Sequence, residues 1–291
     1  MSKFLFFLKA YPFRKRISLL ALLFLEICRI DRTRWERFFD SSLIESRAIL
    51  GFIYNSGGVV NGYSTHLRVI IPYKGTRLIL NLRWNTSDFV VFEQVIIKEE
   101  YAPLIDKNLI SPVIVDAGAN IGCTTIYLKT HYPNSRILSI EPDTSNFKAL
   151  EENVRRCGFD GIVCLQAALW HENGIVHLGR NFRDSRDWSV QVQPNGDAPV
   201  SAGTMGSMLK QMSVEQADIL KMDIEGAELD VFLRDLSLAD VLRRLTLIAI
   251  EVHDDKERQI ERVLTQTGFL IFKQGETLFG KKSVAFNQIN N

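Results

Sequence analysis

The chain has 291 residues, of which 46% are hydrophobic and 24% are charged, and its formal net charge is +1. This is the composition of a globular protein with one large domain, or one domain and an appendage. The near-neutral charge argues against nucleic acid as a partner, because nucleic-acid binders usually carry a strong basic excess. The four cysteines have no paired C-x-x-C spacing, so the sequence supports neither a zinc site nor a disulfide framework and favours a reducing, cytoplasmic compartment.

The first 47 residues are basic, with ten Lys or Arg against five Asp or Glu. Their apolar run, residues 17–25, is shorter than the roughly 20 apolar residues that a membrane-spanning helix needs, and no small-residue cleavage site of a secretory signal is evident. A helix here suits either the surface of an anionic membrane or packing on its own domain or on a partner subunit. We favour packing; peripheral membrane contact through residues 1–47 stays open, and the oligomeric state cannot be inferred.

A β-hairpin is predicted after this segment. Residues 56–58, Ser-Gly-Gly, mark a boundary, and residues 67–71 and 77–82 have the composition of two strands joined by a turn. The helical segment and the hairpin together form a predicted N-terminal extension, residues 1–85.

The second predicted domain, residues 86–291, opens with a helix. The capping residues Asn85-Thr86-Ser87-Asp88 precede an apolar segment, so a helix is expected to start near Ser87 and to close around Tyr101.

The most informative stretch is residues 112–122, P-V-I-V-D-A-G-A-N-I-G. The β-branched run 113–115 is typical of a buried central strand, and residues 121–131 are compatible with a helix. Glycines in a strand-to-helix turn permit close approach of a ligand, and the N–H groups of the helix start favour negative charge. The cofactor-binding residues predicted in this turn are Asp116, Gly118, Ala119, Asn120 and Gly122.

The acid at the strand end indicates which ligand to expect. A nicotinamide-binding turn has the pattern G-x-G-x-x-G, whereas this turn has D-x-G-x-N-x-G. A carboxylate suits an ammonium group better than a pyrophosphate, and S-adenosylmethionine (SAM) carries an amino-acid tail and a sulfonium. A second acid, Glu141, follows the strand 136–140 and is placed to accept the hydroxyls of a ribose. The alternative is that Asp116 and Glu141 cap helices in an unrelated α/β domain.

The α/β alternation continues with a helix at 144–157, a strand at 162–166 and a short strand at 175–178. Residues 181–205 are polar and rich in turn formers, which predicts a long loop. We interpret this loop as a substrate-facing flap in which Trp188 stacks on a sugar face, and a surface insertion without function is an equal alternative.

The remaining strands of the sheet are predicted at 218–222, 247–252, 268–273 and 282–286, with a helix at 255–267. Ligands of open α/β sheets bind beyond the carboxyl ends of the strands. Four polar residues follow or end the first two of these strands and are expected to converge there: Asp223, Glu225, Glu251 and His253.

Several blocks in this order resemble the FkbM-type SAM-dependent methyltransferases. They are V-D-A-G-A-N-I-G, I-E-P-D-T-S-N-F, L-E-E-N, Q-A-A-L, L-K-M-D-I-E-G-A-E-L and I-E-V-H, within residues 86–253. The resemblance implies a Rossmann-like class I methyltransferase fold: a mostly parallel seven-stranded sheet with helices on both faces. It also implies O-methylation of a sugar, glycan or natural product, and contact of the cofactor with Pro142, Ala167 and Ala168.

Methyl transfer to an alcohol needs the acceptor oxygen held in line and a base that takes its proton. His253 is the candidate base because histidine titrates near neutral pH, and Asp223 is the second choice. Glu251 or Glu225 would orient the acceptor hydroxyl. A structural role for His253 is the alternative. Asp223, Glu225 and His253 have the chemistry to hold a divalent ion, but no spacing requires one, so no metal is predicted.

Two other functions remain open at this point. A NAD(P)-dependent oxidoreductase shares the strand-turn-helix and the ribose acid. A non-catalytic scaffold that docks on membranes through the N-terminal segment is the other. The acceptor, whether sugar, lipid-linked glycan, polyketide or amide, cannot be identified from the residues.

Overall fold

The computed structural model describes residues 3–12, 15–17, 20, 41–179, 191–192, 198–252 and 257–283. The chain forms two compact units, one of Met1–Glu99 with Arg155–Gly158 and one of Glu100–Val154 with Phe159–Asn291. The division falls later than the boundary predicted after residue 85, because the helical residues that follow the hairpin pack with the first unit.

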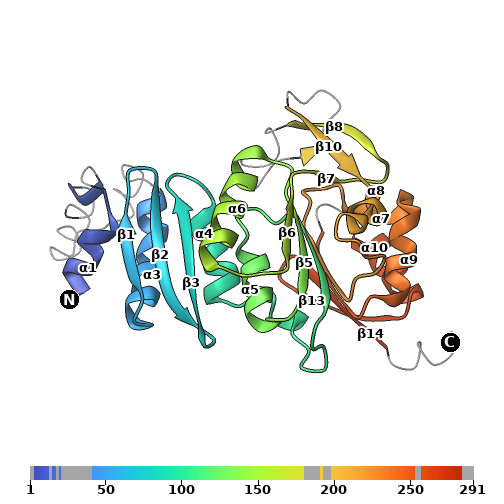
Figure 1. Ribbon diagram of the computed structural model, residues 1–291, viewed down its shortest axis with the longest axis horizontal. Coiled ribbons are helices and arrows are strands. Elements are labelled where there is room, and N and C mark those ends of the chain that lie inside the picture. Colours follow the sequence, from blue (N-terminus) through green and yellow to red (C-terminus); the bar gives the residue numbers. More distant parts are fainter. Residues whose placement is uncertain are drawn as a thin grey trace. The chain divides into compact units, whose positions relative to one another are not determined.

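The first unit contains a three-stranded antiparallel sheet in the order β1-β2-β3, together with helices α1 and α3 (Figure 1). The predicted hairpin is confirmed as β2 and β3, and β1 adds a third strand that the sequence did not indicate. Alternate residues of β2 and β3 are buried, as expected for a sheet with one face on a core. The bounds are α1 Lys3–Ala10, α3 Ser41–Asn55, β1 Val59–Gly62, β2 His66–Tyr73 and β3 Thr76–Arg83.

Helix α1 packs within this unit. The ring of Phe6 contacts Tyr54 of α3 edge-on at 5.3 Å between centroids, and the Tyr11 hydroxyl lies 2.7 Å from Ser46 Oγ. Most of the apolar run 17–25 lies outside the described residues. In the part of the chain that the structure describes, no helix has both the length and the apolarity needed to cross a membrane.

The helix predicted near Ser87 begins at Asp88 as α4 (Asp88–Phe92) and continues as a π-helix, η2 (Glu93–Ile97). Ser87 makes no capping bond through its side chain. The carboxylate of Asp88 instead pairs with the Arg83 guanidinium at 2.7 Å, and this pair is buried on the Asp88 side. The ion pair therefore anchors the helix start to the end of β3.

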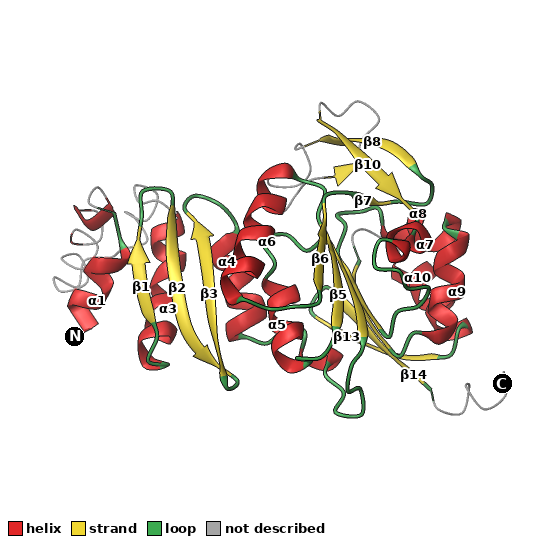
Figure 2. Ribbon diagram, in the orientation of Figure 1, coloured by secondary structure: helices red, strands yellow, loops and turns green. Residues whose placement is uncertain are grey.

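The second unit is built on a seven-stranded sheet in the order β13-β14-β12-β11-β4-β5-β6 (Figure 2). Only β14 runs antiparallel to its neighbours. Helices α5 and α6 cover one face and α8 to α10 the other (Figure 1), which confirms the predicted fold class. The strands are β4 Val113–Ala117, β5 Arg136–Ile140, β6 Ile162–Leu165, β11 Ile219–Met222, β12 Leu247–Glu251, β13 Phe269–Gln274 and β14 Thr277–Lys282. The helices are η3 Ala102–Leu104, α5 Cys123–His131, α6 Thr144–Cys157, α7 Met205–Lys210, α8 Glu228–Arg234, α9 Leu236–Arg244 and α10 Glu257–Gln266.

The last strand was predicted at 282–286, whereas the last described strand is β14, Thr277–Lys282, and residues 284–286 lie outside the described residues. Gly275, at φ +63°, turns the chain tightly, so Thr277 pairs with Gln274 and the strand starts earlier. Gly280 lies in the interior of β14 and lowers the strand propensity of that segment. A Cβ at this position would lie 2.8 Å from the Ile248 side chain. Close packing on β12 explains this glycine.

The predicted loop 181–205 is also corrected, because it contains strands. A separate four-stranded sheet has the order β7-β10-β8-β9, in which β10 pairs parallel with β7 and antiparallel with β8. The predicted strand 175–178 is confirmed within β8. Trp188 and most of the expected flap lie outside the described residues. The bounds are β7 Ala168–Leu169, β8 Gly174–Gly179, β9 Gln191–Val192 and β10 Ala198–Gly203.

Candidate functional site

The turn between β4 and α5 uses its own backbone donors internally. Each of the five N–H groups from residue 118 to residue 122 donates to a protein acceptor. The first two reach the carbonyl of Ile140, the third the carboxylate of Glu141, the fourth the side chain of Asn120 and the fifth the carbonyl of Ala119. The N–H groups of the turn itself are therefore occupied by protein acceptors, and the preference of the helix start, from Cys123 on, for an anionic ligand stays a prediction.

The glycines of this turn serve close approach between parts of the chain. Gly118 has φ +76°, and a Cβ there would lie 1.7 Å from the carbonyl oxygen of Asp223. Gly122 has φ +88°, and its Cβ would lie 2.7 Å from the side chain of Leu150. The first glycine thus lets the ends of β4 and β11 meet, and the second lets α5 pack on α6.

Asp116 lies inside β4 and is fully buried. The Thr125 hydroxyl donates to its Oδ2 at 2.6 Å, and Lys221 Nζ lies 3.5 Å from its Oδ1. The carboxylate therefore supports the turn from beneath, and the predicted direct contact with a ligand ammonium is corrected.

A pocket opens at the carboxyl ends of the parallel strands, where ligands of such sheets bind. Eight of the predicted site residues line it: Gly118, Asn120, Glu141, Pro142, Ala167, Ala168, Asp223 and Glu225. Asp116, Ala119, Gly122 and Glu251 are not among the lining residues. The lining residues that sequence reasoning missed are Ile140, Asn146, Leu169, Leu178, Ile224 and Ala227.

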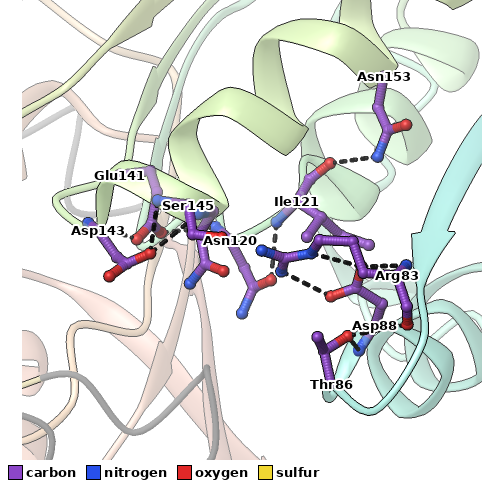
Figure 3. A network of polar contacts seen from close by, with 10 residues as sticks. Arg83, Thr86, Asp88, Asn120, Ile121, Glu141, Asp143, Ser145 and Asn153 are labelled. Atoms are coloured by element: carbon purple, nitrogen blue, oxygen red, sulfur yellow. Dashed lines mark hydrogen bonds and ion pairs between the residues drawn. The ribbon is translucent and has the colours of Figure 1, made fainter. Parts of the chain in front are cut away.

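Glu141 is the acid on the β5 side of this pocket, and it is 5% exposed. Its carboxylate accepts the N–H of Asn120 at 2.8 Å and that of Asp143 at 2.9 Å, as Figure 3 shows. Burial raises the pKa of Glu141 to about 7, although these two N–H groups and Lys221 act to lower it. The two backbone donors hold the carboxylate in one orientation at the pocket wall.

Asp223 and Glu225 lie on the β11 side of the pocket. Glu251 is the last residue of β12 and is half-buried. His253 lies outside the described residues, so its prediction as the base has no structural test. Within the described ranges, no group of three His, Cys, Asp or Glu side chains is arranged to hold a metal ion.

Lys221 was not predicted as part of the site. It lies in β11, is 3% exposed, and donates through Nζ to the carbonyl of Gly118 at 2.7 Å. Burial acts to lower the pKa of its ammonium, but Asp223, Asp116 and two further acids raise it above the usual value. A lysine inside the apolar run I-L-K-M was the available signal, since an unpaired charge is rare in a buried strand.

Two other residues that line the pocket were indicated only weakly by the sequence. Asn146 is 2% exposed in the first turn of α6, where an asparagine is normally explained by capping. Leu178 comes from β8, and only the long-range pairing of that strand brings it to the pocket.

Comparison with known proteins gives a family match. The model of the methyltransferase FkbM domain matches residues 116–271. "Methyltransferase 1" of Beauveria bassiana is 28% identical over 153 residues, which is 45% of this chain and 60% of that protein. "2-O-methyltransferase NoeI" of Sinorhizobium fredii is 25% identical over 167 residues, which is 52% of this chain and 65% of that protein.

Among solved structures, methyltransferase FkbM of Methylobacillus flagellatus aligns with 16% identity and a TM-score of 0.42, over 67% of this chain and 53% of that chain. The alignments thus reach less than two thirds of the length of each of these relatives. The family match covers more than half of the residues and includes both strand ends that form the pocket. The chain therefore belongs to the family of the methyltransferase FkbM domain.

Proposed function

We propose that this protein transfers a methyl group from SAM to a hydroxyl oxygen of a sugar, glycan or natural product. One observation carries the proposal. A single pocket combines Glu141 and small alanines on one side with the acids Asp223 and Glu225 on the other.

The residues of the pocket fit the parts of SAM. Glu141 has a fixed carboxylate that can accept both ribose hydroxyls. Ala167 and Ala168 leave room for a flat ring against the backbone, and Leu169 and Leu178 supply apolar contact. Because Asp116 is buried, the acids that remain to meet the ammonium are Asp223 and Glu225.

The charged residues that line the described pocket are all acids: Glu141, Asp223 and Glu225. Carboxylates accept hydrogen bonds from hydroxyls and repel phosphate or carboxylate groups. A neutral acceptor rich in hydroxyls therefore fits better than an anionic one. The name of the NoeI relative, a 2-O-methyltransferase, agrees with transfer to oxygen.

When bound, SAM supplies an electrophilic methyl group. The protein must hold the acceptor oxygen in line and remove its proton as the new bond forms. We assign the removal of this proton to His253, two positions after the end of β12, with Asp223 as the alternative base. Glu225 or Glu251 would orient the acceptor.

A nicotinamide-dependent oxidoreductase fits less well, because the turn lacks the pattern G-x-G-x-x-G and the N–H groups of residues 118–122 already donate to protein acceptors. Calorimetric titration discriminates between the two functions. We expect S-adenosylhomocysteine (SAH) to bind and NAD to fail to bind, and the opposite result would refute the methyltransferase proposal.

The acceptor class is tested by incubating the protein with SAM and a panel of glycan fractions, with mass spectrometry as the readout. A gain of about 14 Da, the mass of one added CH₂, is expected on a hydroxyl-rich acceptor. The rival role as a membrane-docked scaffold is tested by liposome flotation of the full chain and of a variant without residues 1–47. Binding of only the full chain would support membrane contact by this segment.

A further inference from the structure

Lys221 is buried beneath the pocket in the middle of a central strand. In the register of the sheet its neighbours are Asp116 of β4 and Ala249 of β12, so lysine and aspartate lie side by side on adjacent strands. Burying an ammonium is unfavourable unless it is paired and hydrogen-bonded. The aspartate beside it supplies a partner for the charge.

The ammonium of Lys221 joins two walls of the pocket. It donates to the carbonyl oxygen of Gly118 at 2.7 Å, on the β4 side. It lies 3.6 Å from Asp223 Oδ2, on the β11 side, and 3.5 Å from Asp116 Oδ1 beneath them. Gly118 and Asp223 line the pocket, whereas Lys221 does not. The lysine therefore acts on the pocket through its neighbours.

The charges around this ammonium come from the end of its own strand, from both neighbouring strands and from the end of β5. Asp116 of β4, Glu141 after β5, Asp223 after β11 and Glu251 of β12 all raise the pKa of Lys221. The ring of Tyr101 lies 5.9 Å from Nζ. Four carboxylates in so small a volume repel one another unless a cation lies among them. Lys221 is placed to balance them.

We propose that Lys221 is a positioning residue: its ammonium is the counter-ion of the four neighbouring acids, two of which line the pocket, and it fixes the glycine turn through the carbonyl of Gly118. This inference rests on the proposed function, since the pocket is probed with SAH. Lys221 lowers the pKa of Glu141, the acid that faces the ribose. Without the ammonium, Glu141 ionises at higher pH. The turn that carries Asn120, which donates to Glu141, also loses the hydrogen bond from Lys221 to the carbonyl of Gly118.

The test compares Lys221→Met with Lys282→Met, two buried lysines of the same unit. Lys282 donates to the backbone carbonyls of Leu242 and Thr267, and its pKa is lowered by burial alone. SAH affinity is measured by calorimetry between pH 6 and pH 9. For Lys221→Met we expect binding weaker by on the order of tenfold at pH 7, with partial recovery as the pH rises. For Lys282→Met the ratio of its SAH affinity to that of the wild type should not change with pH. Equal pH profiles in the two variants would overturn the proposal.

A second measurement needs no ligand. Urea unfolding is followed for Lys221→Met, Asp223→Asn and the double variant, whose charge balance is restored. The double variant should unfold at a higher urea concentration than Lys221→Met. If Lys221→Met does not fold, the same comparison decides: folding of the double variant supports the counter-ion role, and failure overturns it. Absence of SAH binding by the wild type would refute the proposed function but leave this unfolding test intact.

Discussion

Glu141 is a buried carboxyl group with a raised pKa, so the pH dependence of stability reports on its burial at the site. Its pKa is about 7 in the folded protein and about 4.5 when unfolded, so between these pH values the folded state holds the extra proton. Stability should therefore fall as pH rises from 4.5 to 7, by up to about 3 kcal/mol from this group. Below pH 4.5 this loss of stability is absent, and above pH 7 the loss stays constant.

Glu141→Gln should remove this part of the pH dependence. Urea unfolding at pH 4.5, 6 and 8 measures it, with the exposed α6 variant Glu151→Gln as the control for loss of one carboxylate. We expect Glu141→Gln to gain stability relative to wild type as pH rises. A constant difference across the three pH values would show that the acid is not buried as described.

Two residues compete for the role of base, and their variants separate them. His253→Ala should retain SAH affinity and lose at least about tenfold in turnover, because the proton of the acceptor hydroxyl has lost its acceptor. Asp223→Asn, at the pocket wall and 3.6 Å from Lys221, should change both SAH affinity and turnover. Unchanged turnover in His253→Ala would transfer the role of base to Asp223.

Gly118 illustrates a strong constraint on one backbone position. Gly118→Ala combines a positive φ of +76° with a Cβ 1.7 Å from the Asp223 carbonyl oxygen, so we expect a loss of about 3 kcal/mol or more in the free energy of unfolding. Gly275→Ala is the matched control, since φ is +63° there but no atom lies within 4 Å of its Cβ. The control should lose only about 1 kcal/mol. Similar losses in the two variants would mean that the strands do not approach as closely as described.

At the scale of elements, one carboxylate joins two helices. Asp235 is the N-cap of α9: its Oδ1 accepts the N–H groups of Ser237 and Leu238, and its Oδ2 accepts the N–H of Met205 at the start of α7. Asp235→Ala removes the cap and leaves a buried donor unpaired, at a combined cost of about 2–4 kcal/mol. Asp235→Asn keeps an acceptor for the cap and should lose less. Chemical denaturation measures both variants, and a loss below about 0.5 kcal/mol for alanine would contradict this reading.

The elements also show which predictions a sequence supports. The strand 136–140 and the helix 144–157 were predicted with their observed bounds, because apolar runs and a glycine stop make local signals strong. The sheet of β7 to β10 was missed because its strands are short and pair over long stretches of chain. The same reason hid Leu178 from the predicted site.

At the scale of the whole molecule, the acids after β5 and β11 were predicted at the pocket because carboxyl ends of parallel strands share one edge of the sheet. The glycine turn was predicted in place, and two of its residues, Gly118 and Asn120, line the pocket. Sequence reasoning assigned its free N–H groups and its missing side chains to a ligand. The structure uses them to join β4, β5 and β11, and these contacts depend on three-dimensional neighbours that spacing does not reveal.

Hydrogen exchange tests whether the two compact units respond differently to the cofactor. Every residue that lines the pocket belongs to the unit of Glu100–Val154 and Phe159–Asn291. Binding at 100 times the dissociation constant stabilises the protein by about 2.7 kcal/mol, which is enough to slow local opening measurably. SAH should therefore slow exchange most at residues 118–122, 140–146, 167–169 and 223–227. NAD at the same concentration is the control and should leave these segments unchanged. Protection by SAH that is strongest in β1 to β3 would place the ligand outside this pocket and contradict the assignment of the site.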